Sequence, residues 1–465
     1  MNWSGPKHLM RLAAVAPLAV SVATLFACSE RPTDPSSFPS VARADAVADR
    51  LGNDRFDGAA TTLAWEQTTR DLVANRKATP INAVRLYALH SLAVYAAVVA
   101  VQDGDNDDAD DQGGGRAAFE ARRGAIGGAS AQLLSALSPP DAPALEAQLA
   151  ASGRDASGRT SPQFTRGVSV GRGVGAVLIA WANNDGFSLA WNESMRNASG
   201  PGIWEGAPAV GTVPRPAPAG YQFPTMTPYF LTALGGHTAQ SQFRSSPPPA
   251  FSMALGSPYR IALDEVRAIS DTRTLEQTDI AYFWNLAAGT MTALGYWDNQ
   301  AASFIESRGL DEQSASHLFA LLNAAAMDAT IGCWEAKVHY FMLRPSMADP
   351  LITRPTLERP NGPPAFPYTL PNHPSYPSGH SCVSSAAATV LSQYFPDQAA
   401  QLQAQVIQAG LSRIYGGIHY RFDVEAGQVL GRSTAEWAMA YDRRHGLLAA
   451  IGLGGHKEGG DDGRE

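Results

Sequence analysis

Helical periodicity is the feature that most constrains this chain, because it continues from residue 63 almost to the end of the sequence. Apolar residues recur at spacings of three and four, and alternating strand patterns are nearly absent. Helices are predicted at residues 82–101, 116–137, 141–152, 162–183, 258–269, 275–295, 298–308, 311–343, 379–395, 398–414 and 422–445. The sequence therefore predicts an all-α protein.

Two segments need separate interpretations. The helix at 82–101 is almost entirely apolar but contains His90, so we predict a buried core helix rather than a membrane span. His90 is then a core histidine and not a ligand. Residues 187–250 are rich in glycine, proline and aromatic residues, and we expect this long loop to wrap the bundle and line the mouth of a pocket.

Charged and polar residues suited to chemistry gather between residues 337 and 423. Lys337 and Arg344 are seven apart, which places them on one face of a helix that Pro345 would end. An arginine can hold two oxygens of a phosphate-like group, while a lysine acts as a point charge. Taken alone, the pair also fits two solvated cations on a helix face.

The run Pro377-Ser378-Gly379-His380 is predicted to begin the helix at 379–395. Ser378 is a favoured N-cap, and Gly379 lets a ligand approach the backbone closely. The free amides of a helix N-terminus bind anions, and His380 lies beside them as a candidate general acid or base. The alternative is an ordinary helix cap followed by a surface histidine.

A third cation, Arg413, precedes His419 by six residues, and the intervening glycines allow the chain to bend so that both face one point. Asp423 lies four residues after His419 and can accept one imidazole hydrogen, which fixes the tautomer. Alone, this pair also fits a hydrogen bond on a helix surface. Together with the two preceding motifs, it predicts a site for a tetrahedral or trigonal-bipyramidal oxyanion.

The pattern Lys-x6-Arg-Pro, Pro-Ser-Gly-His and Ser-Arg-x5-His-x3-Asp resembles the signature shared by type 2 phosphatidic acid phosphatases and vanadium-dependent haloperoxidases. Longer runs resemble the bacterial vanadium haloperoxidase branch, namely 326–337, 373–376, 280–284 and Phe243-Arg244 with the prolines 247–249. The likeness extends over about residues 55–445. It implies helical bundles with the active site in the C-terminal bundle.

The resemblance also implies roles for individual residues. Vanadate would be bound by Lys337, Arg344, Ser378, Gly379 and Arg413, with His419 as the axial ligand of the metal. His380 would deprotonate hydrogen peroxide, and a halide would then be oxidised, with a small organic molecule as the final acceptor. His373 falls where bromide-oxidising members are similar in carrying histidine, which favours bromide or iodide.

Two other functions remain open on the sequence. An acid phosphatase with the same site would hydrolyse phosphomonoesters, with His419 as nucleophile and His380 as general acid, and phosphate would compete with vanadate. A non-catalytic phosphate-binding surface protein needs the cations but neither His380 nor the pair of His419 and Asp423. The carboxylate partner of Arg413 is also open, with Asp328, Glu276 and Asp279 as candidates.

The N-terminus has the layout of an export signal. Basic Lys7 and Arg11 precede the apolar run 12–27, and Cys28 follows Leu-Phe-Ala directly. This resembles a bacterial lipoprotein signal, and predicts an exported protein that is attached to a membrane only through a lipid on Cys28. An ordinary signal with a chance cysteine is the alternative. The predicted segments are a signal peptide at 1–27, a flexible tether at 28–50, an N-terminal helical region at 51–250, a C-terminal catalytic domain at 251–450 and a disordered tail at 451–465.

Charge and cysteine content bear on nucleic-acid binding, calcium binding and disulfide formation. The net charge of -8 argues against a nucleic-acid partner. The aspartate-rich segment 103–111 departs from a calcium-loop pattern, so we predict a solvated acidic loop, with weak calcium binding as the alternative. Cys333 and Cys382 flank the motifs, and either a disulfide or two buried free thiols would fit.

Overall fold

The computed structural model describes residues 58–105, 114–196, 199–206, 215–231, 245–356 and 368–453. Within these ranges the regular structure is helical, and extended pairing is limited to isolated bridges. The all-α prediction is therefore confirmed. The predicted signal peptide, Cys28, the tether, most of the acidic loop and the tail from residue 454 lie outside the described residues.

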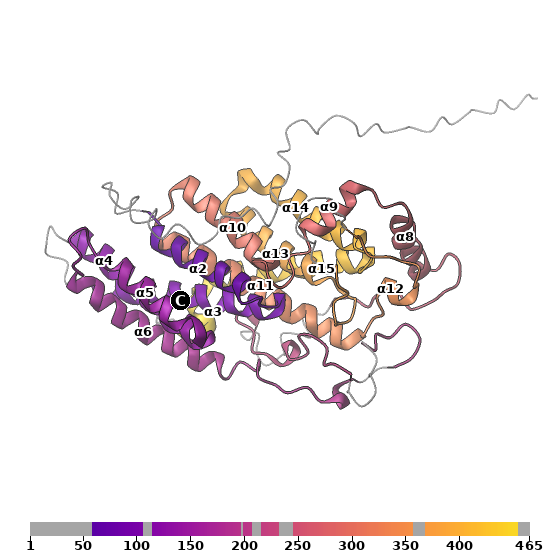
Figure 1. The fold of residues 1–465 in the computed structure, drawn as a ribbon, viewed down its shortest axis with the longest axis horizontal. Helices are drawn as coiled ribbons and strands as arrows, with labels where there is room; N and C mark the ends of the chain where they lie inside the picture. Colours follow the sequence, from indigo (N-terminus) through magenta and orange to yellow (C-terminus); the bar gives the residue numbers. More distant parts are fainter. Residues whose placement is uncertain are drawn as a thin grey trace, which may run out of the picture. The chain divides into compact units, whose positions relative to one another are not determined.

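Most helices lie within a few residues of their predicted positions (Figure 1). They are α2 (Ala60–Asn75), α3 (Pro80–Asp105), α4 (Gly114–Leu137), α5 (Ala142–Ser152), α6 (Pro162–Ala182), α8 (Pro258–Thr272), α9 (Leu275–Phe283), α10 (Thr292–Arg308), α11 (Glu312–Tyr340), α12 (Pro345–Ala348), α13 (Gly379–Tyr394), α14 (Ala399–Tyr415) and α15 (Arg421–His445).

Two predicted helices are wrong in extent. The helix predicted at 275–295 ends at Phe283, and a non-helical segment at 284–291 separates α9 from α10. Leu286 in this segment has a φ of 39°, a left-handed conformation that no helix accommodates. The helix predicted to reach residue 343 ends at Tyr340, because Phe341 has a φ of 45°. Both breaks lie beside the candidate site.

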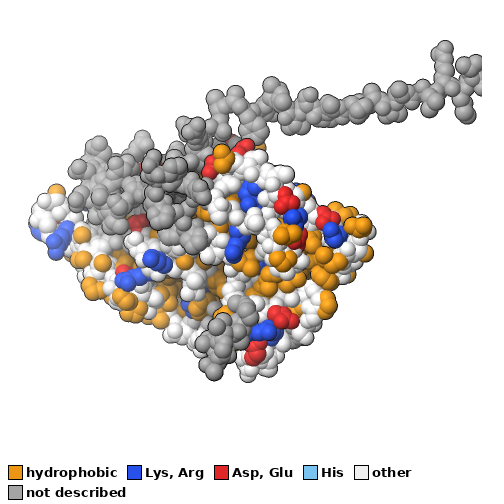
Figure 2. Space-filling view, turned by 45° about the vertical axis from the view of Figure 1, so that its right-hand side comes forward, with side chains coloured by type: hydrophobic (Ala, Val, Ile, Leu, Met, Phe, Trp, Pro, Cys, Tyr) orange, Lys and Arg blue, Asp and Glu red, His pale blue; other side chains and the backbone are white. Residues whose placement is uncertain are grey.

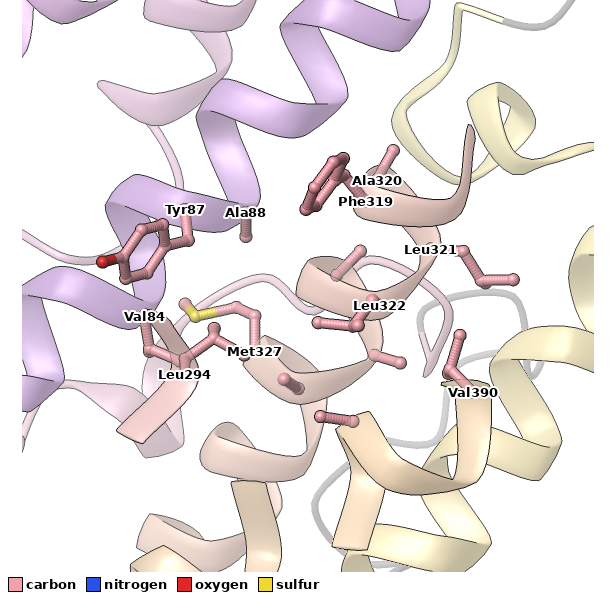
Figure 3. Packing of buried hydrophobic residues seen from close by; sticks show 14 of the residues in the cluster. Val84, Tyr87, Ala88, Leu294, Phe319, Ala320, Leu321, Leu322, Met327 and Val390 are labelled. Atoms are coloured by element: carbon pink, nitrogen blue, oxygen red, sulfur yellow. The ribbon is translucent and has the colours of Figure 1, made fainter. Parts of the chain in front are cut away.

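Helix α11 forms the centre of the fold. Nearly all of its residues from Ala315 to Lys337 are buried, and it packs against α3, α13 and α15. Figure 3 shows Met327 and Leu322 of α11 among side chains of α3 and α10, with Val390 of α13 near Leu321. This core contains residues from both sides of residue 250, where we predicted a domain boundary. The boundary stays a prediction.

Helix α3 is the predicted core helix. Its segment Pro80–Gln102 has the length and hydropathy to cross a membrane, but 72% of its most apolar window is buried inside the fold. His90 is fully buried, and its Nε2 atom lies 3.0 Å from the hydroxyl of Ser130. These observations agree with a core helix and a core histidine.

The long loop packs against the segments that carry the site residues. Ala219 donates its N–H to the carbonyl of Asn372 at 2.8 Å, and its own carbonyl accepts from the indole of Trp334 at 2.7 Å. The amide of Leu343 donates to the carbonyl of Gly202 at 2.8 Å.

The surface charge is mixed on the face shown in Figure 2. The described basic side chains lie scattered there and often beside acidic ones, which is unlike a nucleic-acid-binding surface.

Candidate active site

Lys337 lies in the last turn of α11 and is completely buried. Its ammonium donates to the carbonyls of Pro374 at 2.9 Å and Ser375 at 2.8 Å, and also to the carbonyl of Pro377. An ammonium has three hydrogens, so these three bonds use all of them. Burial, together with the charge of nearby Arg344, lowers the pKa of Lys337 to about 8.

Arg344 reaches the same segment by a route that the sequence did not predict. We expected Lys337 and Arg344 on one helix face, but α11 ends before Arg344, which is extended and precedes α12. Pro345 begins α12 instead of ending the longer helix. The guanidinium of Arg344 is fully buried and donates from Nε to the carbonyl of His373 at 2.9 Å and from Nη1 to that of Ile418 at 2.7 Å.

The Pro-Ser-Gly-His run begins α13 as predicted. Ser378 is the N-cap and Gly379 is the first helical residue. A Cβ at Gly379 would lie 3.2 Å from the ring of Trp334, so the glycine keeps this helix start uncrowded. His380 follows in the first turn and is only partly buried. The free amides of this turn are available to an anion.

The segment between α9 and α10 positions His380. The imidazole forms hydrogen bonds to the backbone of Trp284 and Asn285, whereas its Nε2 atom has no partner among the described residues. Desolvation, and then the charge of Arg413, lowers the pKa of His380 well below its ordinary value. The ring is therefore neutral at neutral pH, with one nitrogen free to take or give a proton.

Arg413 lies in the last turn of α14 and is buried. Its Nη1 donates to the carbonyl of Trp284 at 2.6 Å, and its Nη2 donates to the hydroxyl of Tyr368. Within the described residues no carboxylate pairs with it, and Asp328 accepts instead from the amides of Tyr229 at 2.8 Å and of Phe230 at 2.9 Å. The Nε atom of Arg413 has no partner in the described part of the chain.

His419 and Asp423 form the predicted pair. His419 Nδ1 lies 2.8 Å from Asp423 Oδ2, although His419 precedes α15 and does not share a helix face with Asp423. Ser375 donates its hydroxyl to the same oxygen at 2.5 Å. Burial raises the pKa of Asp423 to about 6, so the carboxylate is ionised at pH 7. Because Nδ1–H donates to that carboxylate, Nε2 of His419 keeps its lone pair.

His373 completes the group. It lies above Trp334, with a ring-centroid distance of 5.1 Å, and its Nδ1 is 3.1 Å from Nη2 of Arg344. A guanidinium can only donate, so this contact favours Nδ1 as an acceptor with the ring hydrogen on Nε2. The carbonyl of Pro374 lies at the same 3.1 Å from Nδ1 and favours the other tautomer, in which Nδ1–H donates to it.

Cys333 and Cys382 are both buried and both free. Cys333 lies 3.8 Å from the carbonyl of Pro377, which also accepts from Lys337. The free-thiol alternative is therefore the one that the structure adopts.

The residues fit a tetrahedral oxyanion. Three buried cations and a helix N-terminus converge, and two buried atoms there, Nε of Arg413 and Nε2 of His380, lack partners among the described residues. An oxyanion carries acceptors for the Nε–H of Arg413 and for the helix amides, and a charge that offsets the cations. Sequence reasoning missed Ser375, Tyr368 and the carbonyl of Trp284, which hold these groups in place.

Comparison with known proteins agrees with this chemistry. The model of the PAP2 superfamily matches residues 315–446. A non-specific acid phosphatase of Salmonella typhi is 34% identical over 111 residues, which are 24% of this chain and 41% of the relative. A non-specific acid phosphatase of Providencia stuartii is 27% identical over 187 residues, 40% of this chain and 68% of the relative. The match thus spans about two fifths of the Salmonella relative.

Solved structures of two bacterial enzymes share the overall fold of this chain. A bacterial vanadium-dependent iodoperoxidase has a TM-score of 0.64 at 21% identity, over 84% of this chain and 97% of that one. A bacterial vanadium-dependent chloroperoxidase has a TM-score of 0.58 at 14% identity, over 79% and 93% of the two chains. At these identities the likeness shows a shared fold. With the family match over the motif region, it confirms the resemblance seen in the sequence: residues 315–446 match the PAP2 superfamily and are similar to acid phosphatases, and the chain shares its fold with vanadium haloperoxidases.

Proposed function

We propose that this protein is a vanadate-dependent haloperoxidase that uses hydrogen peroxide to oxidise a halide, with bromide or iodide favoured. The observation that supports it is the extent of the structural likeness, which includes the N-terminal helices and covers 97% of the iodoperoxidase. The matched part of the Salmonella phosphatase covers only 41% of that relative.

In this proposal the oxyanion is vanadate. Arg344, Arg413, the hydroxyl of Ser378 and the amide of Gly379 would hold its oxygens, and Lys337 would contribute positive charge, since the amide of Ser378 already donates to the carbonyl of Asp423. Nε2 of His419, whose orientation is fixed by the 2.8 Å bond to Asp423, would bind the vanadium. Bound vanadate supplies a Lewis-acid centre that activates the peroxide.

His380 would act as the base towards hydrogen peroxide. Its lowered pKa keeps the ring neutral at neutral pH, and its Nε2 atom lacks a partner among the described residues. Nε2 can therefore accept a proton from a peroxide molecule that enters the site. The Nε2–H of His373, in the tautomer that the contact with Arg344 favours, would donate a hydrogen bond to the halide.

An acid phosphatase is the second candidate, favoured by the similarity to the Salmonella and Providencia enzymes. His419 would attack phosphorus, and His380 would protonate the leaving oxygen. This role needs a protonated His380, whereas desolvation and Arg413 lower its pKa. The negative charge of a bound phosphate ester would have to raise that pKa before the ester could be cleaved.

One assay separates the two candidates. The purified chain is stripped of metal and oxyanions, then tested for bromination of a phenol dye with peroxide and bromide, with and without orthovanadate. We expect vanadate-dependent bromination that His419→Ala abolishes and that His445→Ala, an exposed histidine at the end of α15, retains. No bromination, together with p-nitrophenyl phosphate hydrolysis that vanadate inhibits, would favour the phosphatase.

Export and lipid attachment at Cys28 are part of the proposal and rest on the sequence alone. Expression in a Gram-negative host with labelled palmitate should label the wild-type chain in the membrane fraction. Cys28→Ser should remove the label and release the protein from membranes. Unchanged labelling in that variant would contradict the anchor.

A further inference from the structure

Tyr368 contacts the cation for which no carboxylate partner is present among the described residues. Its side chain is 5% exposed, its hydroxyl accepts from Nη2 of Arg413, and its ring centroid lies 5.4 Å from the guanidinium carbon. We propose that Tyr368 is a positioning residue that holds Arg413 without neutralising it, and so makes the site selective for dianionic tetrahedral oxyanions. This inference rests on the proposed function, in which the site binds such an oxyanion.

The net charge of the buried site indicates which anion it should prefer. Lys337, Arg344 and Arg413 are all buried, and the described carboxylate that acts on Lys337 and Arg344 is Asp423. Three cations and one carboxylate leave a surplus of two positive charges, which a dianion neutralises.

A phenol preserves this surplus where a carboxylate would reduce it. The hydroxyl of Tyr368 accepts a hydrogen bond while it remains neutral, and burial raises its pKa further. A glutamate or aspartate in its place would form a buried ion pair with Arg413. The surplus would then fall to one, and the site would fit a monoanion.

The surrounding residues hold Tyr368 in this position. Its ring packs edge-on against Tyr282 with the centroids 5.7 Å apart. A Cβ at Gly416 would lie 2.2 Å from the tyrosine hydroxyl, so the glycine leaves the space that this hydroxyl occupies. Arg413 is also fixed by the carbonyl of Trp284 at 2.6 Å, which leaves Nε directed away from both partners.

Sulfate and perchlorate provide a matched pair of probes, since both are tetrahedral with four oxygens but carry two charges and one. Their affinities are measured by calorimetry at pH 7 for the wild-type chain and for Tyr368→Gln and Tyr368→Glu. The control is Tyr282→Phe, which removes a neighbouring hydroxyl that bonds to the carbonyl of Pro355 rather than to Arg413. Circular dichroism establishes that each variant is folded.

The wild type should bind sulfate at least about tenfold more tightly than perchlorate, since one further unit charge interacts with the buried surplus. Tyr368→Gln should weaken both anions by a similar factor and keep their ratio. Tyr368→Glu should weaken sulfate about 100-fold more than perchlorate, because sulfate carries one further unit charge at about 6 Å from the new carboxylate with an effective dielectric constant of 20, and this loss removes the preference for sulfate. Tyr282→Phe should match the wild type.

A Tyr368→Glu variant that keeps the preference for sulfate would overturn the proposal. So would a wild-type chain that binds the two anions equally, an outcome that needs no variant to fold. A wild-type chain that binds neither anion, and neither phosphate nor vanadate, would instead overturn the proposed function itself.

Discussion

At the scale of residues, His419 depends on groups that its own motif does not contain. Ser375 is completely buried, and it donates to the same oxygen of Asp423 that accepts from His419. The run His-Pro-Ser-Tyr around Ser375 supported the family resemblance, but nothing in it indicated this contact. A buried serine is usually satisfied by a local backbone carbonyl, so no sequence pattern pairs it with a residue 48 positions away.

Ser375→Ala should make activity more sensitive to acid. Burial raises the pKa of Asp423 to about 6, and the hydrogen bond from Ser375 opposes that rise. Without the bond the pKa rises further, so the ionised carboxylate that orients His419 is lost at a higher pH. We expect kcat/KM to fall about fivefold at pH 6 for a rise of about one pKa unit, because the ionised fraction of Asp423 falls from about one half to about one tenth, with little change at pH 8.

The pH profile of the variant is the measurement for this prediction. Ser385→Ala is the control, because its hydroxyl bonds to the carbonyl of Gln428 and to none of the site residues. An acid limb that stays in place in Ser375→Ala would show that Asp423 does not depend on this serine.

At the scale of elements, the helices were largely predictable and the breaks beside the site were not. The period of 3.6 residues identified α13, α14 and α15 almost to their ends. The break at 284–291 has no proline, and its apolar pattern continues across it, so periodicity predicted one helix. Tertiary contacts interrupt the helix there, because the carbonyl of Trp284 accepts from Arg413 instead of from a helical N–H.

The α4–α6 pair should be sensitive to a single methyl group. A Cβ at Gly171 would lie 2.0 Å from the carbonyl oxygen of Ala125, so Gly171→Ala must push two backbones apart. We expect it to destabilise the fold by about 1–3 kcal/mol, as overpacking does. Gly173→Ala, on the same helix with nothing within 4 Å, should raise stability by up to about 1 kcal/mol. Thermal melts of the two variants test this, and similar melting temperatures would contradict such close packing.

At the scale of the whole molecule, stability depends on a buried polar group far from the site in sequence. Asp298 of α10 is fully buried, with Glu66, Arg70 and Asn323 near it. Neither periodicity nor composition predicted these charges in a core, because the sequence does not show which helix faces meet. The motifs predicted the C-terminal site far better, since its residues are close together in the chain.

Asp298→Asn should reduce the loss of stability at higher pH. Burial and then Glu66 raise the pKa of Asp298 well above its ordinary value, so the folded state binds a proton that the unfolded state releases. Its contribution is complete at low pH and is lost as the pH rises through the folded-state pKa. In urea unfolding between pH 5 and 8, the wild type should lose up to about 1.4 kcal/mol more per pH unit than Asp298→Asn. Asp264→Asn, on the exposed face of α8, should retain the wild-type slope.

The three carbonyls around Lys337 have a consequence for how the protein exchanges its ligands. Because a side chain of the protein itself shapes the Pro374–Pro377 segment, the site is preorganised, and its conformational entropy is lost during folding rather than during binding. One oxyanion can then replace another without rebuilding the segment. Under the proposed function, vanadate and phosphate esters would then compete for the site according to their relative abundance around the protein, as well as through the residues that receive them.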